Sequence, residues 1–587
     1  MDIFSILSLI GGLALFLYGM DVMGDGLKKL SGSKLEYFLG QLTSNRFKGF
    51  LLGFIVTAVI QSSSATTVML VGFVNSGIMR LSQTISTIMG ANVGTTVTSW
   101  LLSTTGISGD TFFIKILKPE AWTPILAAIG AGMVMFSESD KQKNIASILL
   151  GFAVLMFGMD AMSEAVSVLK SDPNFAKILI MFENPLMGIL AGTILTAIIQ
   201  SSSASVGILQ ALSATGTITY AVALPIILGQ NIGTTITPIL SAINANKDSK
   251  RVAVTCLYIK IIGVIIVSVG FYAINSFIAF PFMKDGNYVN AFNIAVIHTL
   301  FNIISTVILI PFTKQIEKLA YFTIKDKGDE DKEFDPFATL DDRFFTVPGF
   351  AVEKCRELTY EMAKIAQEAV FDSTNILNNY SRDAEENIAK LEKRVDKYED
   401  KISAYLVGLA EKNLNTSDSH QVTKILHIIG DVERISDHAL NICETAEEMH
   451  DKKISFSGEA NKEIGVLTDA VREILSITIN MLENDDLQIA KRIEPLEQII
   501  DNLKNKIKNN HIMRLQVGEC TVELGFILSD LLTNYERIAD HCSNIAVAVL
   551  GNANSNFEAH DYMMHVKNEG KNEFFEQYDY YKTKYSI

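Results

Sequence analysis

Two hydroxyl- and amide-rich segments lie inside otherwise apolar stretches of this sequence. The segment QSSSA occupies positions 61–65 and returns at positions 200–204, an offset of 139 residues. Serine hydroxyls and glutamine amides can donate hydrogen bonds to the oxygens of an anion, and they can also accept, as a cation ligand must. Hard oxygen ligands of this kind suit a hard cation such as Na⁺. The candidate binding residues are Gln61, Ser62, Ser63, Ser64, Gln200, Ser201, Ser202 and Ser203.

The same offset relates two further pairs of segments. GANVGTT at 90–96 returns as GQNIGTT at 229–235, and GMD at 19–21 returns at 158–160. Three matched blocks without a gap indicate a duplicated unit. The competing interpretation is that small and hydroxyl residues only allow membrane helices to pack closely. The second block adds the candidate ion ligands Asn92, Thr95, Thr96, Asn231, Thr234 and Thr235.

Apolar stretches of about 20 residues, the length that crosses a bilayer, fill the first half of the chain. Seven crossings are predicted, at 4–23, 84–103, 121–137, 144–168, 221–241, 252–275 and 290–312. Two more stretches, at 47–77 and 186–216, are interrupted by the QSSS motif, and each arm is too short to cross alone. They are predicted to be re-entrant helical hairpins. Lys260 lies inside one crossing, where it either reaches back to the interface or draws anions.

The distribution of Lys and Arg predicts the orientation in the membrane. One side carries Lys28, Lys29, Lys34, Arg46, Lys48, Arg80, Lys141, Lys143, Lys247, Lys250 and Arg251, and the other carries Lys115, Lys118, Lys170, Lys177 and Lys284. Placing the larger set in the cytoplasm puts the N-terminus outside and the polar second half inside. The first hairpin then enters from the cytoplasm and the second from outside, so the two repeats are predicted to be inverted.

The predicted organisation is a membrane domain, a linker, a helical domain and a tail. The membrane domain covers 1–312, with repeat 1 at 1–138, repeat 2 at 139–275 and an extra helix at 290–312; the linker is 313–350, the helical domain 351–551 and the tail of unknown role 552–587. The net charge of −15 argues against nucleic acid as a partner. The five cysteines form no Cys-x-x-Cys pair, which argues against a disulfide framework or a zinc ribbon.

The polar half contains a second duplication within six predicted amphipathic helices, which fit two three-helix bundles. DVERISDH at 431–438 returns as NYERIADH at 534–541. Carboxylates four residues apart share one helix face, where like charges repel unless a cation lies between them. The pattern predicts either a metal cluster or a solvated acidic face. The candidate ligands are Glu433, Asp437, Glu536 and Asp540, followed by Glu392, Asp396, Glu497 and Asp501.

The paired QSSS motifs resemble those of the type II sodium–phosphate cotransporter family, and the resemblance covers residues 5–312. It implies that the serine motifs line a shared site for inorganic phosphate and Na⁺. The chain is similar to the compact bacterial branch, because the large disulfide-bonded loop of the animal members is missing. Residues 350–550 resemble the PhoU phosphate-signalling family, whose Glu/Asp-x-x-x-Asp motifs bind iron or zinc clusters. That resemblance implies an iron or zinc cluster on the candidate carboxylates.

The resulting expectation is an all-α, multi-pass protein of the inner cell membrane, with the C-terminal domain in the cytoplasm. Its expected function is Na⁺-coupled transport of inorganic phosphate by alternating access, with a regulatory PhoU-like domain. The alternatives are a phosphate sensor, or a phosphate exporter with little concentrative uptake. An enzyme is not expected, because the serines have no His and Asp partners in register. Expected partners are the lipid bilayer and either a second copy of the chain or a phosphate-signalling protein.

Overall fold

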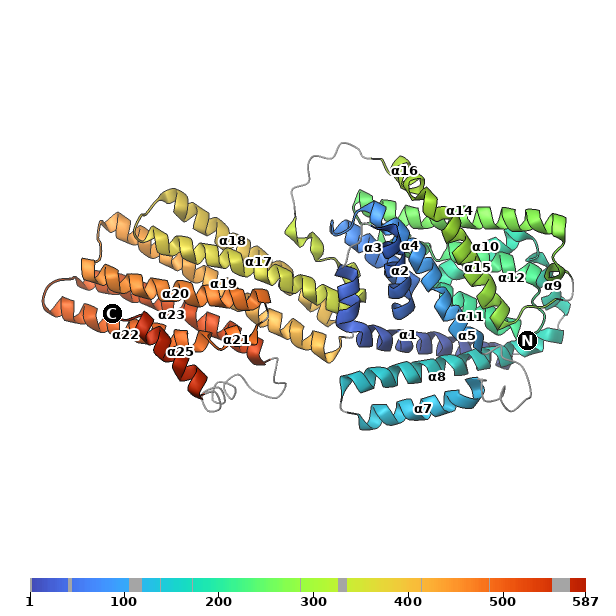
Figure 1. Ribbon diagram of the computed structural model, residues 1–587, viewed down its shortest axis with the longest axis horizontal. Coiled ribbons are helices and arrows are strands. Elements are labelled where there is room, and N and C mark those ends of the chain that lie inside the picture. Colours follow the sequence, from blue (N-terminus) through green and yellow to red (C-terminus); the bar gives the residue numbers. More distant parts are fainter. Residues whose placement is uncertain are drawn as a thin grey trace. The chain divides into compact units, whose positions relative to one another are not determined.

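The computed structural model describes residues 3–40, 45–104, 119–137, 139–171, 173–284, 287–325, 335–412, 414–484, 486–551 and 571–587, so Lys115 and Lys118 lie outside the described residues. The chain forms two compact units, Met1–Gly349 and Phe350–Ile587. Within the described ranges every regular element is a helix, and one isolated β-bridge joins Thr219 to Tyr288 (Figure 1). The prediction of an all-α protein is confirmed for these residues.

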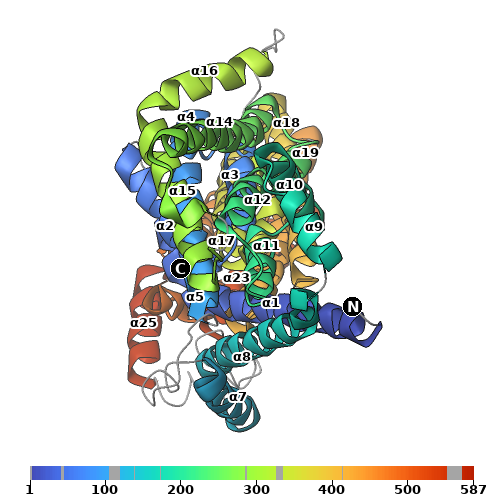
Figure 2. The same ribbon diagram turned by 90° about the vertical axis from the view of Figure 1, so that its right-hand side faces the viewer.

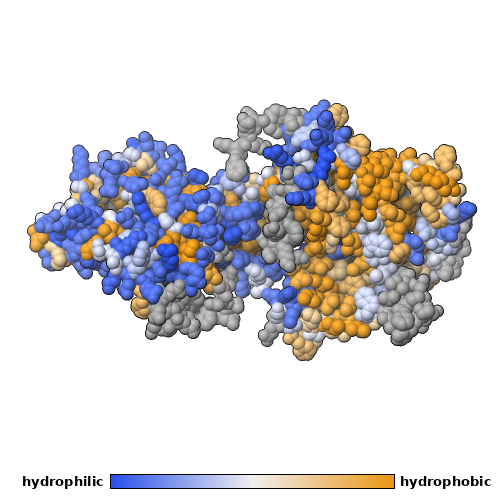
Figure 3. Space-filling model, in the orientation of Figure 1, coloured by the Kyte–Doolittle hydropathy of each residue, from blue (hydrophilic) through white to orange (hydrophobic). Residues whose placement is uncertain are grey.

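The first unit contains the apolar helices, and a broad hydrophobic surface covers it in Figure 3. Five helical spans are long and apolar enough to cross a membrane. They are Ile3–Leu30 within α1 (Ile3–Gly40), α8 (Asp140–Ser167), Tyr220–Ser241 with α12 (Tyr220–Gly233) and α13 (Ile236–Ser241), α14 (Lys247–Ile278), and Ala291–Thr323 with α15 (Ala291–Leu309) and α16 (Thr313–Thr323).

Two of the seven predicted crossings are not among these five spans. The stretch 84–103 is divided at Thr95 into α4 (Leu81–Gly94) and α5 (Thr96–Ser103). The apolar part of α7 (Pro119–Phe136) is Ala121–Phe136. This part is shorter than the roughly 20 residues that cross a bilayer.

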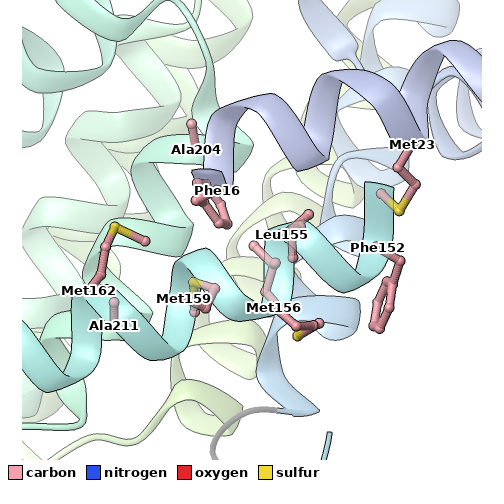
Figure 4. Packing of buried hydrophobic residues seen from close by; sticks show 10 residues of the cluster. Phe16, Met23, Phe152, Leu155, Met156, Met159, Met162, Ala204 and Ala211 are labelled. Carbon is pink, nitrogen blue, oxygen red and sulfur yellow. The ribbon is translucent and has the colours of Figure 1, made fainter. Parts of the chain in front are cut away.

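Helices α1 and α8 lie side by side over much of their length (Figure 2). Their backbones approach closely at glycines: a Cβ atom on Gly19 would lie 2.3 Å from the backbone nitrogen of Leu155, and one on Gly158 would lie 2.4 Å from that of Phe16. Side chains around this contact form a buried cluster with Ala204 (Figure 4). Because Gly19 and Gly158 are 139 residues apart, matching parts of the duplicated sequence form this contact.

Each QSSS motif separates two short helices. The first pair is α2 (Arg46–Ile60) and α3 (Ser63–Asn75), and the second is α10 (Pro185–Ile199) and α11 (Ser202–Ser213), preceded by α9 (Pro173–Met181). The packing around the two pairs is equivalent. A Cβ atom on Gly53 would lie 2.0 Å from the carbonyl oxygen of Thr87, and one on Gly192 would lie 2.1 Å from that of Ile226. These glycines let α2 contact α4 and let α10 contact α12 at the same place in each copy.

The segment predicted to be a linker is partly folded onto the membrane unit. It contains α16 and two 3-10 turns, η5 (Pro336–Thr339) and η6 (Asp342–Thr346). The side chain of Phe344 is fully buried and packs against Phe73 of α3, with 5.3 Å between ring centroids and 35° between the ring planes. Asp341 accepts a 2.9 Å hydrogen bond from Asn75, and Arg343 donates to the carbonyl oxygen of Ser241. The last part of the segment therefore belongs to the first unit.

The second unit follows the predicted amphipathic pattern. Its helices are α17 (Pro348–Ile376), α18 (Arg382–Ala410), α19 (Thr416–Lys452), α20 (Gly458–Asn484), α21 (Leu487–Ala490), α22 (Ile493–Gln516) and α23 (Val522–Gly551). Helix α19 packs against α18 and α23, and α20 packs against α22 and α23.

The C-terminal tail contains a helix that the sequence did not reveal. Helix α25 (Lys571–Lys584) packs against α22 and buries Tyr581 completely. The hydroxyl of Tyr585 donates a hydrogen bond to Glu473. Residues 571–587 are therefore a structural part of the second unit.

Candidate functional site

The two QSSS glutamines occupy the breaks between the paired helices. Gln61 (φ 59°) and Gln200 (φ 60°) both have a left-handed backbone conformation. This conformation costs a residue with a side chain about 1–2 kcal/mol. Each glutamine N–H closes the preceding helix, bonding the carbonyl oxygen of Thr57 at 2.8 Å or of Thr196 at 2.7 Å. The chain therefore stops one helix and turns at the same point of both motifs.

The next serine of each motif begins the following helix. The Oγ atom of Ser62 accepts from the backbone N–H of Ala65, and that of Ser201 accepts from Ala204, both at 3.2 Å. Serine is a preferred N-cap residue for this reason. A helix N-terminus carries partial positive charge and free N–H groups, which together favour an anion. Each motif thus places hydroxyl groups at a helix end suited to an oxyanion.

Three of the motif serines keep unused hydroxyl groups. Ser63, Ser202 and Ser203 are 7%, 6% and 5% exposed. Among the described residues, none of these three hydroxyls forms a hydrogen bond. Ser64 is half-buried in the same turn. These hydroxyls can donate to a bound anion without giving up a protein partner.

The candidate threonines are buried but already use their hydroxyl hydrogens. Each donates to a carbonyl oxygen of its own helix segment: Thr95 to Ala91 at 2.9 Å, Thr96 to Val93 at 2.7 Å, Thr234 to Gln230 at 3.0 Å and Thr235 to Ile232 at 2.8 Å. Their oxygen lone pairs remain. They can therefore act as acceptors toward a cation, while donation to an anion would require breaking these bonds.

The two candidate asparagines have different surroundings. Asn92 is buried, and its side chain forms no hydrogen bond within the described part of the chain. Asn231 donates to the carbonyl oxygen of Ile227 at 3.0 Å and accepts from the Nζ atom of Lys260 at 2.8 Å. The two copies of the motif are alike in sequence but not in the charge beside them.

The structure links the first broken helix to the second through α5. The hydroxyl of Thr98 donates to the side-chain oxygen of Gln61 at 2.8 Å. The next residue, Ser99, accepts from Gln210 of α11 at its carbonyl oxygen, at 3.0 Å, and bonds His298 through its hydroxyl at 2.8 Å. No hydrogen bond joins the two serine turns directly in the regions described.

Several polar residues of this region were not among the predicted site residues. Thr57 and Thr66 bond each other across the arms of the first broken helix at 3.0 Å, and Thr196 and Ser205 do so in the second at 2.8 Å. Extending the 139-residue offset beyond the three matched blocks would have found both pairs. Lys260 was noted in the sequence, but its contact with Asn231 had no sequence signal.

Three of the predicted metal ligands come together in the second unit. Oxygens of Glu392 and Asp396 on α18 and of Asp437 on α19 lie within 4.8 Å of one another. Burial, and then repulsion from Asp396, raises the pKa of both Glu392 and Asp437. Burial and the Asp437 charge likewise raise the pKa of Glu433. The cluster gathers carboxylate oxygens and negative charge, so it fits a metal ion.

The matching cluster of the second copy contains a lysine. Lys504 of α22 forms an ion pair with Glu536 of α23, and Arg537 lies 3.6 Å from Asp540. Burial raises the pKa of Asp501 and of Asp540, and in both cases repulsion from Glu536 adds to the effect. The fourth predicted residue of this set, Glu497, also lies on α22. Because an ammonium group already balances Glu536, this cluster fits a metal less well than the first.

Histidines join the two copies of the acidic motif. His438 on α19 bonds the side chain of Asn534 at 2.8 Å, and His541 on α23 bonds Asp431 at 2.8 Å. The two rings stack with 5.7 Å between centroids. Burial lowers the pKa of His438. These histidines are occupied in holding α19 to α23.

Comparison with known proteins agrees with the division of the chain into a membrane unit and a second helical unit. A family described as Na+/Pi-cotransporter matches residues 15–164 and 166–283, and the PhoU domain family matches residues 359–446 and 464–549. A protein named "Putative inorganic phosphate export protein YjbB" from Escherichia coli (strain K12) is 22% identical over 550 residues, covering 93% of this chain and 97% of that one.

Two shorter matches involve parts of the chain. "Uncharacterized protein YqeW" of Bacillus subtilis (strain 168) is 30% identical over 313 residues, which cover 53% of this chain and 96% of that protein. "Sodium-dependent phosphate transport protein 2A" of Rattus norvegicus is 35% identical over 98 residues, which cover 16% of this chain and 15% of that protein.

The expected family resemblances are thereby confirmed. The chain is a multi-pass membrane protein of phosphate transport, not an enzyme, with a PhoU-like helical domain as its second half. It belongs to the Na+/Pi-cotransporter family.

Proposed function

We propose that this protein is a secondary carrier that moves inorganic phosphate across the cell membrane by alternating access, and that its net direction in the cell is export. The observation that carries the proposal is the pair of serine turns, each of which places buried, unused hydroxyls at a helix N-terminus. Such turns bind a tetrahedral oxyanion through N–H and O–H donors without a permanent counter-charge.

The donor and acceptor roles divide between the two motifs of each repeat. The serine turns, with Gln61 and Gln200, supply donors for phosphate. The threonine hydroxyls already donate to the helix, so their free lone pairs, with the Asn92 side chain, suit Na⁺ instead. When Na⁺ and phosphate lie side by side, each raises the affinity for the other by charge attraction, which is the basis of coupling.

The architecture of the proposed carrier is two inverted repeats, each with one re-entrant hairpin. The equal breaks at Gln61 and Gln200 and the equal glycine contacts support the duplication. The excess of Lys and Arg on one set of loops supports an N-terminus outside the cell and a cytoplasmic second half. Transport follows when the hairpins open in turn toward opposite sides of the membrane.

Export is supported by the relative with the same domain order. The match to the protein named as a phosphate exporter runs through 93% of this chain and so includes the PhoU-like half. A symporter releases phosphate from the cell whenever the outward driving force of the phosphate gradient exceeds the inward driving force of the Na⁺ gradient. We therefore expect export when cytoplasmic phosphate is high, rather than the concentrative uptake expected from the sequence.

Na⁺-driven uptake is the second candidate. It is supported by the family description and by the short match to a protein named for sodium-dependent phosphate transport. A phosphate sensor that binds without transporting is the third. The exporter, the uptake carrier and the sensor would all use the same phosphate site. Only a measurement of phosphate movement across the membrane therefore distinguishes these three functions.

The second unit is proposed to regulate the carrier from the cytoplasm. The cluster of Glu392, Asp396, Glu433 and Asp437 would hold iron or zinc, and the metal would reduce the repulsion among these carboxylates. A second copy of the chain or a phosphate-signalling protein would bind this domain and respond to its state. Removal of residues 350–587 should leave transport intact and abolish its dependence on phosphate status.

The test is phosphate flux in proteoliposomes that contain the full-length protein. Vesicles loaded with labelled phosphate are diluted into phosphate-free buffer, with equal NaCl or equal choline chloride on both sides. Efflux that requires Na⁺ supports a coupled exporter. Accumulation under an inward Na⁺ gradient, with little efflux at equal Na⁺, favours the uptake carrier. Binding of phosphate without flux in either direction supports a sensor and overturns the carrier.

A further inference from the structure

A buried ammonium group lies in the second half of the membrane unit. Lys260 of α14 is 6% exposed, and its Nζ atom lies 2.8 Å from Oδ1 of Asn231 and 3.5 Å from Oδ1 of Asn302. Both acceptors are neutral amides. Within the part of the chain that the structure describes, Lys260 forms no ion pair.

The surroundings leave this charge uncompensated. An ammonium group has three donors, and the described residues use two of them. The ionisable neighbours are the thiol of Cys256 and the imidazole of His298, and neither is a carboxylate. A buried charge without an opposite charge is costly. Inside membranes such residues mark the path of a substrate or ion.

The contacts of Lys260 place it at the edge of the candidate site. Its partner Asn231 belongs to the GQNIGTT motif. The preceding residue, Gln230, donates a 2.9 Å hydrogen bond to the carbonyl oxygen of Ser205, in the first turn of α11 after the serine turn. Helix α14 also packs against α3, which begins at the other serine turn. The ammonium is therefore linked through α12 to the helix that follows the second serine turn.

The first repeat has no equivalent charge. The position 139 residues before Lys260 is Ala121, and Asn92, which corresponds to Asn231, has no hydrogen-bond partner among the residues described. The two repeats thus offer the same amide oxygen, which bonds a lysine in the second repeat and has no hydrogen-bond partner among the described residues of the first.

We propose that Lys260 is a permanently attached cation of the phosphate site. Its ammonium group balances part of the charge of bound phosphate. In the second repeat it lies next to Asn231, at the position that corresponds to the Na⁺ position next to Asn92 in the first repeat. The carrier therefore needs one dissolved cation fewer than two equal repeats would bind. This inference rests on the proposed function, because it assigns a specificity-determining residue to the same site.

The experiment measures binding of labelled inorganic phosphate to the purified full-length protein, across NaCl concentrations at constant ionic strength with choline chloride. Lys260→Gln keeps hydrogen bonding and removes the charge. We expect its Kd for phosphate to rise roughly tenfold or more at low NaCl, as for loss of a charge-assisted bond. High NaCl should recover part of the loss, because Na⁺ can then enter the emptied place.

Two further variants control for folding and for general charge effects. Lys260→Arg restores the charge and should recover phosphate binding relative to Lys260→Gln. Lys284 is exposed, so Lys284→Gln removes one charge away from the site and should bind phosphate as the natural protein does. A melting temperature within a few degrees of the natural protein shows that each variant is folded.

The outcomes separate this inference from the function on which it rests. A Lys260→Gln variant that binds phosphate within twofold of the natural protein at every NaCl concentration overturns it. A tenfold loss that NaCl does not reverse supports charge balance and overturns replacement of a dissolved cation. Failure of the natural protein to bind phosphate instead overturns the proposed function itself.

Discussion

The hydroxyl of Thr98 donates a 2.8 Å hydrogen bond to the side-chain oxygen of Gln61, whereas the same pair 139 residues later is not formed. Thr237 has a buried hydroxyl without a partner among the described residues, and Gln200 is exposed. Two turns of matching sequence therefore differ in the hydrogen bonds of their glutamine side chains.

Removal of the Thr98 hydroxyl should destabilise the membrane unit. Thr98→Val leaves the side-chain oxygen of Gln61 without the Thr98 hydroxyl, and we expect a loss of about 1 kcal/mol in the free energy of unfolding. This corresponds to a melting temperature about 2–4 °C lower, measured in detergent. Thr237→Val is the matched control and should leave the melting temperature equal or higher, because it removes a buried hydroxyl that has no partner. Equal losses in both variants would show that the asymmetry has no energetic consequence.

Loss of a buried serine hydroxyl should weaken phosphate binding without unfolding the protein. Ser63→Ala and Ser202→Ala each remove one donor to a charged ligand, so we expect a phosphate KM about tenfold higher. The melting temperature should hardly change, because neither hydroxyl bonds the protein in the part described. Ser268→Ala, on an exposed position of α14, is the control for transport assays. Normal uptake and efflux by both site variants would reject the serine turns as the binding site.

Metal binding should depend on the first acidic cluster and not on the second. Added Zn²⁺ or Fe²⁺ should raise the melting temperature of the second unit, because metal binding stabilises the folded state. Asp437→Asn removes a ligand of the cluster with Glu392 and should abolish the rise. Asp540→Asn should preserve it, because Lys504 already balances that cluster. A rise lost in Asp540→Asn and retained in Asp437→Asn would reverse the assignment.

Without metal, the same carboxylates should make the second unit less stable as pH rises. Burial, followed by mutual repulsion, raises the pKa of Glu392, Glu433 and Asp437 in the folded state. Between the ordinary carboxyl pKa and the raised value, the folded state binds more protons than the unfolded state, so stability falls with increasing pH. Thermal melts with a chelator should show this contribution as a difference between the natural protein and Asp437→Asn. An identical pH dependence of both proteins would contradict it.

The contact made by Phe344 should hold the end of the linker on the membrane unit. Phe344→Ala empties a fully buried site against Phe73 and should cost about 3–5 kcal/mol. We expect faster cleavage by trypsin after Arg343, because the segment detaches more often. Asp342→Ala, at the exposed neighbouring position, should be cleaved at the natural rate. Equal rates in the two variants would mean that the buried ring does not hold the segment.

Periodicity and repetition in the sequence predicted much of the fold. The amphipathic pattern predicted six helices, which correspond to α17 to α20, α22 and α23, because each buries one apolar face against its neighbours; the short α21 was not predicted as a separate helix. The offset of 139 residues predicted two equivalent breaks, and Gln61 and Gln200 have nearly equal backbone angles. The tail helix α25 was missed because its Tyr-rich sequence lacks a clear apolar face, although Tyr581 is buried.

The details of the site could not be predicted, because they depend on contacts between distant helices. Lys260 meets Asn302 and Asn231 only after α14, α12 and α15 have packed. Thr98 bonds Gln61 across 37 positions of the chain, while its sequence counterpart Thr237 does not bond Gln200. A repeat in sequence fixes which groups are available, and the tertiary packing fixes which of them meet.

The buried ring of Phe344 also determines where this protein can be cut in two. A membrane half ending near residue 312, at the close of the last apolar stretch, would expose Phe73 and leave Asn75 without Asp341. Such a truncation exposes an apolar surface that is buried in the full-length protein, and exposed apolar surface promotes aggregation. A membrane half that extends through Gly349 keeps these contacts, and a PhoU-like half that begins at Phe350 takes none of them away. The boundary between the two halves therefore lies beyond the charged linker, at the first helix of the PhoU-like half.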